Sequence, residues 1–387
     1  MNNSLKKTGR IHGLDALRAV MMLLGVVLHS SETYNLGADP FWPKDPNATH
    51  IFQNYLNSMI HIFRMPLFFL LAGFFGALLF YERGTRAMLE NRFKRLVLPF
   101  LVFLMLLHPI VIWAINYASD TFNEPIAGLL HDWKRLPRIT YHLWFLYYLI
   151  LITTIMYGLA LLMRRLPLVS AWLMRLFDRL FSNRSAFIPL FSIIVFLMLV
   201  WIWDTWAPTP LDFVPDIKML LFYGLYYGIG WMLFKQQKYL HHFLRFDRLF
   251  LLLAIVVFTL KFFFRSYVDD VLYGALNAII IWFFVFGFIG TFLRYCNKGS
   301  HTWRYISDAS YWVYLVHLPL TFFFPAVIAG LALPAFVKFL IVMTLTSLVC
   351  FLSYHFLVRA SFIGQFLNGR KYPIKKTKVI PFKPSEP

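Results

Sequence analysis

The sequence predicts an all-α, polytopic integral membrane protein: a bundle of about ten transmembrane helices with both termini in the cytoplasm. Composition is the first observation, because 59% of the 387 residues are hydrophobic and only 14% are charged. Soluble domains carry roughly 25% charged residues, so a soluble enzyme or a disordered chain is excluded. The other two observations are a series of long apolar runs and an uneven distribution of Lys and Arg between the loops.

Ten apolar runs have the length that a membrane helix needs, which is about 20 residues. The run at 217–234 is short, and Asp269 and Asp270 form a tight turn between two later runs. The ten runs are 14–33, 56–81, 96–117, 139–163, 187–206, 217–234, 249–268, 271–293, 305–329 and 335–357.

Lys and Arg concentrate on alternate loops, as expected when cytoplasmic loops carry the positive charge. With the N-terminus in the cytoplasm, 28 of the 37 Lys and Arg lie in inside segments and six in outside loops. The exception is the loop 118–138, where Lys134, Arg135 and Arg138 are offset by acidic residues. The net charge of +19 therefore reflects topology and attraction to an anionic inner leaflet. It does not indicate nucleic-acid binding.

The chain divides into one membrane-embedded domain, 1–360, and a basic cytoplasmic tail, 361–387, which we expect to be flexible. Residues 171–181 alternate apolar and basic residues at helical spacing, which predicts a short helix on the cytoplasmic surface. The absence of an internal repeat argues against an inverted-repeat transporter. Two cysteines exclude a disulfide framework, and the sequence leaves open whether the chain forms a homo-oligomer.

Arg18 and His29 are the clearest polar pair in the first run. Eleven residues at 100° each end about 20° past three turns, so both side chains share a helix face, roughly 16 Å apart along the axis. Glu32 follows His29 by three residues and could orient or charge the imidazole ring. Alternatively, Arg18 is an anchor at the cytoplasmic boundary and His29 is a hydrogen-bonded core residue.

Two further pairs have the i, i+3 spacing that places side chains on one helix face. His61 and Arg64 lie at the outer boundary of the second run, where they could meet a hydroxylic or anionic substrate, or act as interfacial anchors. Arg92 and Arg95 lie at the cytoplasmic entry to the third run. Two guanidinium groups on one face suit a phosphate-rich ligand, although simple topological anchoring also explains them.

Polar residues in the later runs complete the set of candidates. His142 and Trp144 begin the fourth run at its outer end, and Tyr314 and His317 lie near the middle of the ninth. Ionisable groups inside a membrane are costly, so their presence favours a function. No grouping has the spacing of a zinc site, and we predict no catalytic metal.

Five segments together resemble the membrane-bound acyltransferase 3 family. GLDALRAVMMLLGVVLH contains Arg18, ten residues and then His29, and NRFKRLVLPFL contains an R-x-x-R pair, Arg92 and Arg95. HIFRMPLFFLLAGFF, HLWFLYYLI and SDASYWVYLVHLPL complete the pattern. The resemblance extends over most of the chain, from Leu14 to His317.

The resemblance implies a ten-span enzyme of the bacterial inner membrane that moves an acyl group from cytosolic acyl-CoA to a hydroxyl of an extracytoplasmic glycan. In the most similar branch the group is succinyl and the acceptor is an osmoregulated periplasmic glucan. Acyl-CoA is then a co-substrate, not a permanently bound cofactor. His29 matches the essential histidine of the family, and Arg18, Arg92 and Arg95 match arginines linked to the acyl donor. The expected substrate-binding residues are His61, Arg64, His142, Trp144, Tyr314 and His317.

The physical properties of coenzyme A fit this assignment. Its phosphates cannot enter hydrocarbon and should stay at the cytoplasmic arginines, while the thin pantetheine arm spans the distance to His29. His29 is then a general base or forms an acyl-histidine, and His61 and Arg64 are candidates for the distal carboxylate of a succinyl group. The alternatives are an O-acetyltransferase for another envelope glycan, an exporter of glycan or lipid with His29 and His317 as proton-relay groups, and a scaffold without chemistry.

Overall fold

The computed structural model describes residues 11–37, 39, 41–124, 136–203, 207–369 and 372, with the side chains of 184–186 and 201–203 excepted. Within these residues the chain is helical, and its single β-bridge joins Ile139 to Asp212. The all-α prediction is therefore confirmed. Lys134 and Arg135, which stand out in the predicted loop 118–138, lie outside the described residues.

The α-helices are α1 His12–Glu32, α2 Ile51–Leu78, α3 Thr85–Arg92, α4 Leu98–Phe122, α5 Trp144–Arg165, α6 Pro167–Ser182, α7 Arg184–Trp203, α8 Ile217–Lys235, α9 Asp247–Phe263, α10 Asp270–Tyr295, α11 His301–Val327, α12 Ala335–Ser353 and α13 Phe362–Asn368. Short π-helical turns are η1 Leu79–Arg83, η2 Phe93–Val97 and η7 Tyr354–Val358, and 3₁₀ turns are η4 Tyr141–Leu143, η5 Gln237–Leu244 and η6 Arg265–Tyr267.

Eight helical segments of the described residues are long and apolar enough to cross a membrane, not the ten that we expected. The predicted span 187–206 overlaps the 20-residue α7, whose described side chains are those of 187–200. Together with α6 this part of α7 forms one candidate broken span, bent by 114°. The predicted span 249–268 corresponds to α9, which has 17 residues. At 1.5 Å per residue it is about 26 Å long, slightly less than the thickness of the hydrocarbon core.

Polar side chains mark where several of these helices begin. The Asp216 carboxylate accepts a hydrogen bond from the Lys218 backbone N–H before α8, and Asp269 accepts one from Leu272 before α10. Short acceptors at this position satisfy backbone groups that would otherwise lack a partner. The turn expected at Asp269 is thus the start of α10.

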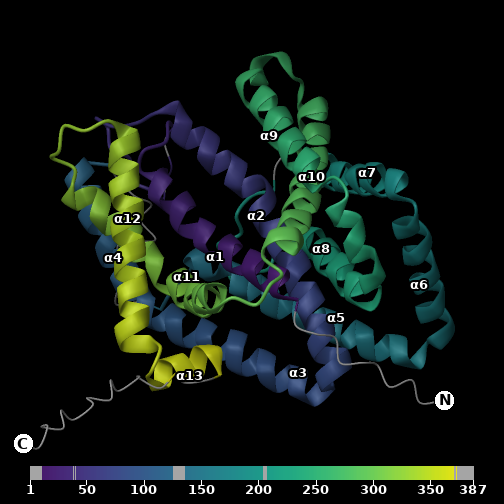
Figure 1. Ribbon diagram of the computed structural model, residues 1–387. Coiled ribbons are helices and arrows are strands. Elements are labelled where there is room, and N and C mark those ends of the chain that lie inside the picture. Colours follow the sequence, from purple (N-terminus) through teal and green to yellow (C-terminus); the bar gives the residue numbers. More distant parts are fainter. Residues whose placement is uncertain are drawn as a thin grey trace, which may run out of the picture.

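Helix α1 lies inside the bundle and packs against α2, α10, α11 and α12. In Figure 1, α12 and α13 lie at one edge of the molecule and α6 lies at the opposite edge. Helices α2 and α8 cross so closely that a Cβ atom at Gly73 would overlap the Tyr227 carbonyl oxygen, and one at Gly230 would overlap the Leu70 carbonyl oxygen. Small residues permit such backbone contact between membrane helices.

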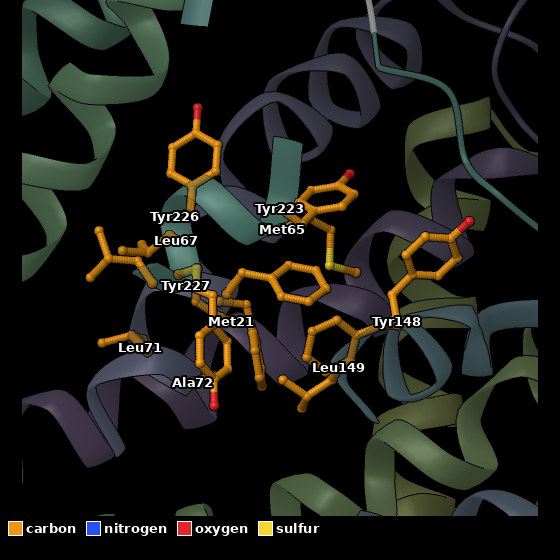
Figure 2. Close-up of a cluster of buried hydrophobic side chains, with 14 of the residues drawn as sticks. Met21, Met65, Leu67, Leu71, Ala72, Tyr148, Leu149, Tyr223, Tyr226 and Tyr227 are labelled. Carbon is orange, nitrogen blue, oxygen red and sulfur yellow. The ribbon is translucent and has the colours of Figure 1, made fainter. Parts of the chain in front are cut away.

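A buried cluster fills the space between α1, α2, α5 and α8. Figure 2 shows Met21 of α1, Ala72 of α2 and Leu149 of α5 together with Tyr223 and Tyr227 of α8. All five side chains are buried. The two tyrosines are four residues apart on α8, so the cluster extends over at least one helical turn, about 6 Å.

The beginning of the predicted flexible tail is a helix. Residues 362–368 form α13, and the Arg95 guanidinium donates a hydrogen bond to the Asn368 carbonyl oxygen at 2.7 Å. The Asn368 amide in turn donates to the Asp308 carbonyl oxygen at 3.1 Å. These contacts bind α13 to η2 and α11, so the folded part extends beyond residue 360. Residues 370, 371 and 373–387 of the tail lie outside the described residues.

Candidate active site

Helix α1 carries Arg18, Gly25 and His29 along one face, because steps of seven and four residues both return close to the same direction. Near the N-terminal end of the helix, Arg18 lies 3.7 Å from the Asp15 carboxylate, and its guanidinium lies over the Phe75 ring at 5.4 Å. His29 lies near the other end, beside a cavity. The two polar groups are therefore separated along the helix as their spacing predicts.

The cavity has a volume of about 310 Å³ and is lined by residues from α1, α2, α4, α5, α7, α8, α10 and α11 and by the connections that follow α1 and α7 and precede α5. Aromatic side chains form much of its wall, including Phe41, Trp42, Tyr141, Phe222 and Tyr223. The sequence-predicted residues that line it are His29, Glu32, His61, Arg64, His142 and Trp144. Its described lining includes neither Tyr314 nor His317.

Trp42 holds the His29 ring. Its indole stacks on the imidazole with ring centroids 5.3 Å apart and planes at 7°. The indole itself is fixed by a 2.9 Å hydrogen bond from Nε1 to Thr33 Oγ1 and by the Phe322 ring at 4.0 Å. Sequence reasoning missed Trp42 because it lies in an irregular connection, thirteen residues from His29, where no helical spacing relates the two side chains.

Glu32 does not orient the His29 ring as we expected. Its carboxylate accepts a 2.9 Å hydrogen bond from the Asn35 amide, and the Lys44 ammonium donates to the Glu32 carbonyl oxygen at 2.8 Å. Burial lowers the pKa of Lys44, while the Glu32 carboxylate acts in the opposite direction. Glu32 is the last residue of α1, so Asn35 and Lys44 of the following connection lie close enough to bind it. The Nδ1 atom of His29 has no hydrogen-bond partner among the described residues.

Two further imidazoles lie close to His29. His317 lies 5.4 Å from it and 5.1 Å from His142, measured between ring centroids. His317 Nδ1 lies 2.8 Å from the Tyr314 carbonyl oxygen, and His142 Nε2 lies 3.1 Å from the Leu315 carbonyl oxygen. Carbonyl oxygens only accept, so these nitrogens carry the ring protons. His317 Nε2 and His142 Nδ1 are buried and without a partner in the described structure.

Tyr314 contacts His142 through both its hydroxyl and its ring. Its hydroxyl donates to the His142 carbonyl oxygen at 2.9 Å, and its ring contacts the edge of the His142 ring. Arg64 lies on the adjacent side of the cavity and is 7% exposed. Its NH1 atom is buried without a hydrogen-bond partner among the described residues. The region around His29 thus combines one permanent cation with four imidazoles, those of His29, His61, His142 and His317.

Arg92 lies near Arg18, at the other end of the α1 face. Gly76 makes room for it, because a Cβ atom there would lie 3.4 Å from Arg92 NH2 and would overlap the Tyr227 hydroxyl. The Arg18 and Arg92 charges are close enough to repel one another. Two nitrogens of Arg92, Nε and NH2, are buried without hydrogen-bond partners in the described part of the chain. Two clustered cations with unused donors fit an anionic ligand.

Arg95 does not share this site with Arg92, contrary to the expectation from their i, i+3 spacing. Arg92 directly precedes the π-helical turn η2, Phe93–Val97, and Arg95 lies within it. A π-turn has more residues per turn than an α-helix, so three residues rotate the side chain through a smaller angle. The Arg95 guanidinium therefore reaches Asn368 instead. The backbone carbonyl oxygen of Arg95 accepts a hydrogen bond from the Tyr311 hydroxyl at 2.7 Å.

The two polar regions are separated by the buried cluster of Figure 2. Tyr223 lines the cavity and Tyr227 lies beside Arg92, and Met21 of α1 belongs to the same buried cluster. The described lining of the cavity includes none of the three predicted acyl-CoA arginines. A ligand that contacts both the Arg18–Arg92 cluster and the His29 cavity must therefore pass through this apolar layer.

Comparison with known protein families identifies the family of this chain. The family model for the acyltransferase domain of acyltransferase 3 proteins matches residues 11–355. The chain belongs to the acyltransferase 3 family. Relatives include the "Glucans biosynthesis protein C" of Salmonella schwarzengrund, Salmonella typhimurium and Salmonella typhi, each 25% identical over 394 aligned positions, with 95% of this chain and 96% of the relative covered. No solved structure matches the chain.

As an acyltransferase 3 member, the protein is a polytopic membrane acyltransferase. The chemistry of its cavity suits acyl transfer to a hydroxyl, because an imidazole at a cavity wall can accept a hydroxyl proton. An indole face such as that of Trp42 suits an imidazolium, since aromatic faces attract cations. Arg64 adds a permanent positive charge to the cavity wall.

Proposed function

We propose that this protein is an O-acyltransferase of the bacterial inner membrane that moves a succinyl group from cytosolic acyl-CoA to hydroxyls of an osmoregulated periplasmic glucan. The observation that carries the proposal is the single face of α1 that joins the Arg18–Arg92 cluster to the His29 cavity. A transferase with an acyl donor on one side of the membrane and an acceptor on the other needs two such sites, one for each substrate. The names of the relatives, which refer to glucan biosynthesis, support the acceptor class.

Coenzyme A binds with its phosphates at Arg18 and Arg92 on the cytoplasmic side. Guanidinium groups form strong hydrogen bonds to phosphate, and Arg92 has unused donors at Nε and NH2. The pantetheine arm then extends along α1 for roughly 16 Å, displacing the flexible side chain of Met21. Arg95 supports the site indirectly by fixing the end of α13.

The glucan hydroxyl enters the cavity from the periplasmic side and meets the thioester at His29. His29 takes the hydroxyl proton while the oxygen attacks the thioester carbon, and the C–S bond then breaks. The proton passes from the imidazolium to the leaving thiolate, so the reaction produces an ester and free coenzyme A without net proton release. His61 lies on the cavity wall and supplies a polar contact that favours a succinyl carboxylate over an acetyl methyl group.

The test is mass spectrometry of periplasmic glucans from cells that carry the wild type, His29→Ala or the matched control His355→Ala, which changes an exposed histidine outside the cavity. We expect succinyl mass increments with the wild type and the control and none with His29→Ala, at equal protein levels in the membrane. Normal succinylation by His29→Ala would refute the catalytic assignment. An acetyl increment would refute the donor, and a defect in glycan export without any acyl ester would indicate a transporter.

A further inference from the structure

Two buried polar atoms face the same space beside Gly25 on α1. A Cβ atom at Gly25 would lie 3.4 Å from His317 Nε2 and 3.6 Å from Arg64 NH1. Both atoms lack hydrogen-bond partners among the described residues, and their side chains belong to residues that are 1% and 7% exposed. Unpartnered buried polar atoms are costly, so a pair of them at one place is suited to contact one polar ligand group.

The two atoms differ in chemistry. Arg64 NH1 can only donate hydrogen bonds. His317 Nδ1 carries the ring proton because it lies 3.1 Å from the Val313 carbonyl oxygen and 2.8 Å from that of Tyr314, which leaves an accepting lone pair on Nε2. The pair therefore matches a group with an acceptor and a donor side by side, as in a secondary amide.

The arrangement of helices also fits an amide. In a trans amide the C=O and N–H bonds point in opposite directions, so their partners must approach from two sides. Arg64 comes from α2 and His317 from α11, and both helices pack against α1. Because glycine has no side chain, Gly25 leaves the sides of His317 Nε2 and Arg64 NH1 that face α1 uncovered.

The position along α1 identifies which amide this is, given the proposed donor. Gly25 precedes His29 by four residues, about 6 Å along the axis, on the side toward Arg18. In an acyl-CoA, two methylene groups separate the thioester sulfur from the first amide nitrogen, which places that amide about 5 Å behind the thioester carbon by ordinary bond lengths. A thioester at His29 therefore brings this amide to Gly25.

We propose that Gly25, Arg64 and His317 form a subsite for the first amide of the pantetheine arm. Arg64 NH1 donates to the amide oxygen, and the amide N–H donates to His317 Nε2. The subsite rests on the proposed function and adds to it the recognition of the donor arm. It fixes the thioester at one distance from His29, independently of the phosphate contacts at the far end of the arm.

The test compares succinyl-CoA with an analogue in which an ester oxygen replaces the N–H of the first amide. We expect the wild type to use the analogue about tenfold less well in kcat/KM, the effect of one buried hydrogen bond. His317→Phe removes the acceptor and should abolish the preference. Gly25→Ala should lower kcat/KM at least tenfold for both donors, while Gly158→Ala, which adds a methyl group in open space, should change neither.

Gly25→Ala is informative because it should fold. Its Cβ makes only ordinary van der Waals contacts, and alanine favours a helix more than glycine does, so a loss of activity reports on the occupied space. Equal use of both donors by the wild type, or full activity of Gly25→Ala, would overturn the subsite and assign the two atoms to water. Failure of the wild type to transfer from succinyl-CoA at all would instead refute the proposed function.

Discussion

Replacement of Lys338 by methionine tests whether a buried ion pair holds the connection between α1 and α2. Lys338 Nζ lies 2.8 Å from Asp45 Oδ2, and each side chain is 2% exposed. At an effective dielectric constant of 20, the attraction at this distance is about 6 kcal/mol, similar to the cost of burying both charges. The intact pair therefore contributes little net stability. Loss of Lys338 leaves the Asp45 carboxylate buried alone, which should cost about 3–5 kcal/mol.

The assay is unfolding of the detergent-solubilised protein, with chemical denaturant and helical circular dichroism as the signal. Lys338→Met should lower the free energy of unfolding by the amount above, and the double variant Asp45→Leu/Lys338→Met should recover most of it, because apolar residues replace both charges. Lys298→Met, at an exposed site, is the control and should change stability by less than about 0.5 kcal/mol.

The same substitution should reduce activity. The connection held by Asp45 also carries Trp42, whose indole stacks on His29, so a loosened connection leaves the catalytic ring without its support. The reasoning is refuted if Lys338→Met unfolds like the wild type. It is refuted equally if the double variant is less stable than either single variant.

The remaining predictions concern the arginine cluster and the closest helix crossing. In the double variant Arg18→Gln/Arg92→Gln, the KM for acyl-CoA should rise at least tenfold with little change in kcat. High salt should raise the KM of the wild type toward the same value, because it screens the charges. An unchanged KM in the double variant would mean that the two arginines are only topological anchors. Gly73→Ala should destabilise the protein by about 1–3 kcal/mol, since its Cβ overlaps the Tyr227 carbonyl oxygen, whereas Gly158→Ala has open space. Equal thermal unfolding temperatures for these two variants would contradict the close contact between α2 and α8 at Gly73.

Local information in the sequence determined the helical architecture and part of the site. Long apolar runs require helices because hydrocarbon offers no hydrogen bonds to the backbone, and Asp269 marks the start of α10. Arg18 and His29 are brought onto one face by helical periodicity alone. Each of these features depends on residues within one helix, so no knowledge of packing was needed.

Tertiary structure decided which side chains meet. Trp42 reaches His29 from an irregular connection, and Glu32 is engaged by Asn35 instead. The π-turn directs Arg95 away from the cluster that Arg92 joins. In a membrane protein nearly every helix face is apolar, so hydrophobic pattern alone does not specify neighbours. Close packing and the few polar contacts between helices select one arrangement, and the unpartnered atoms beside the α1 face become visible only when that arrangement is known.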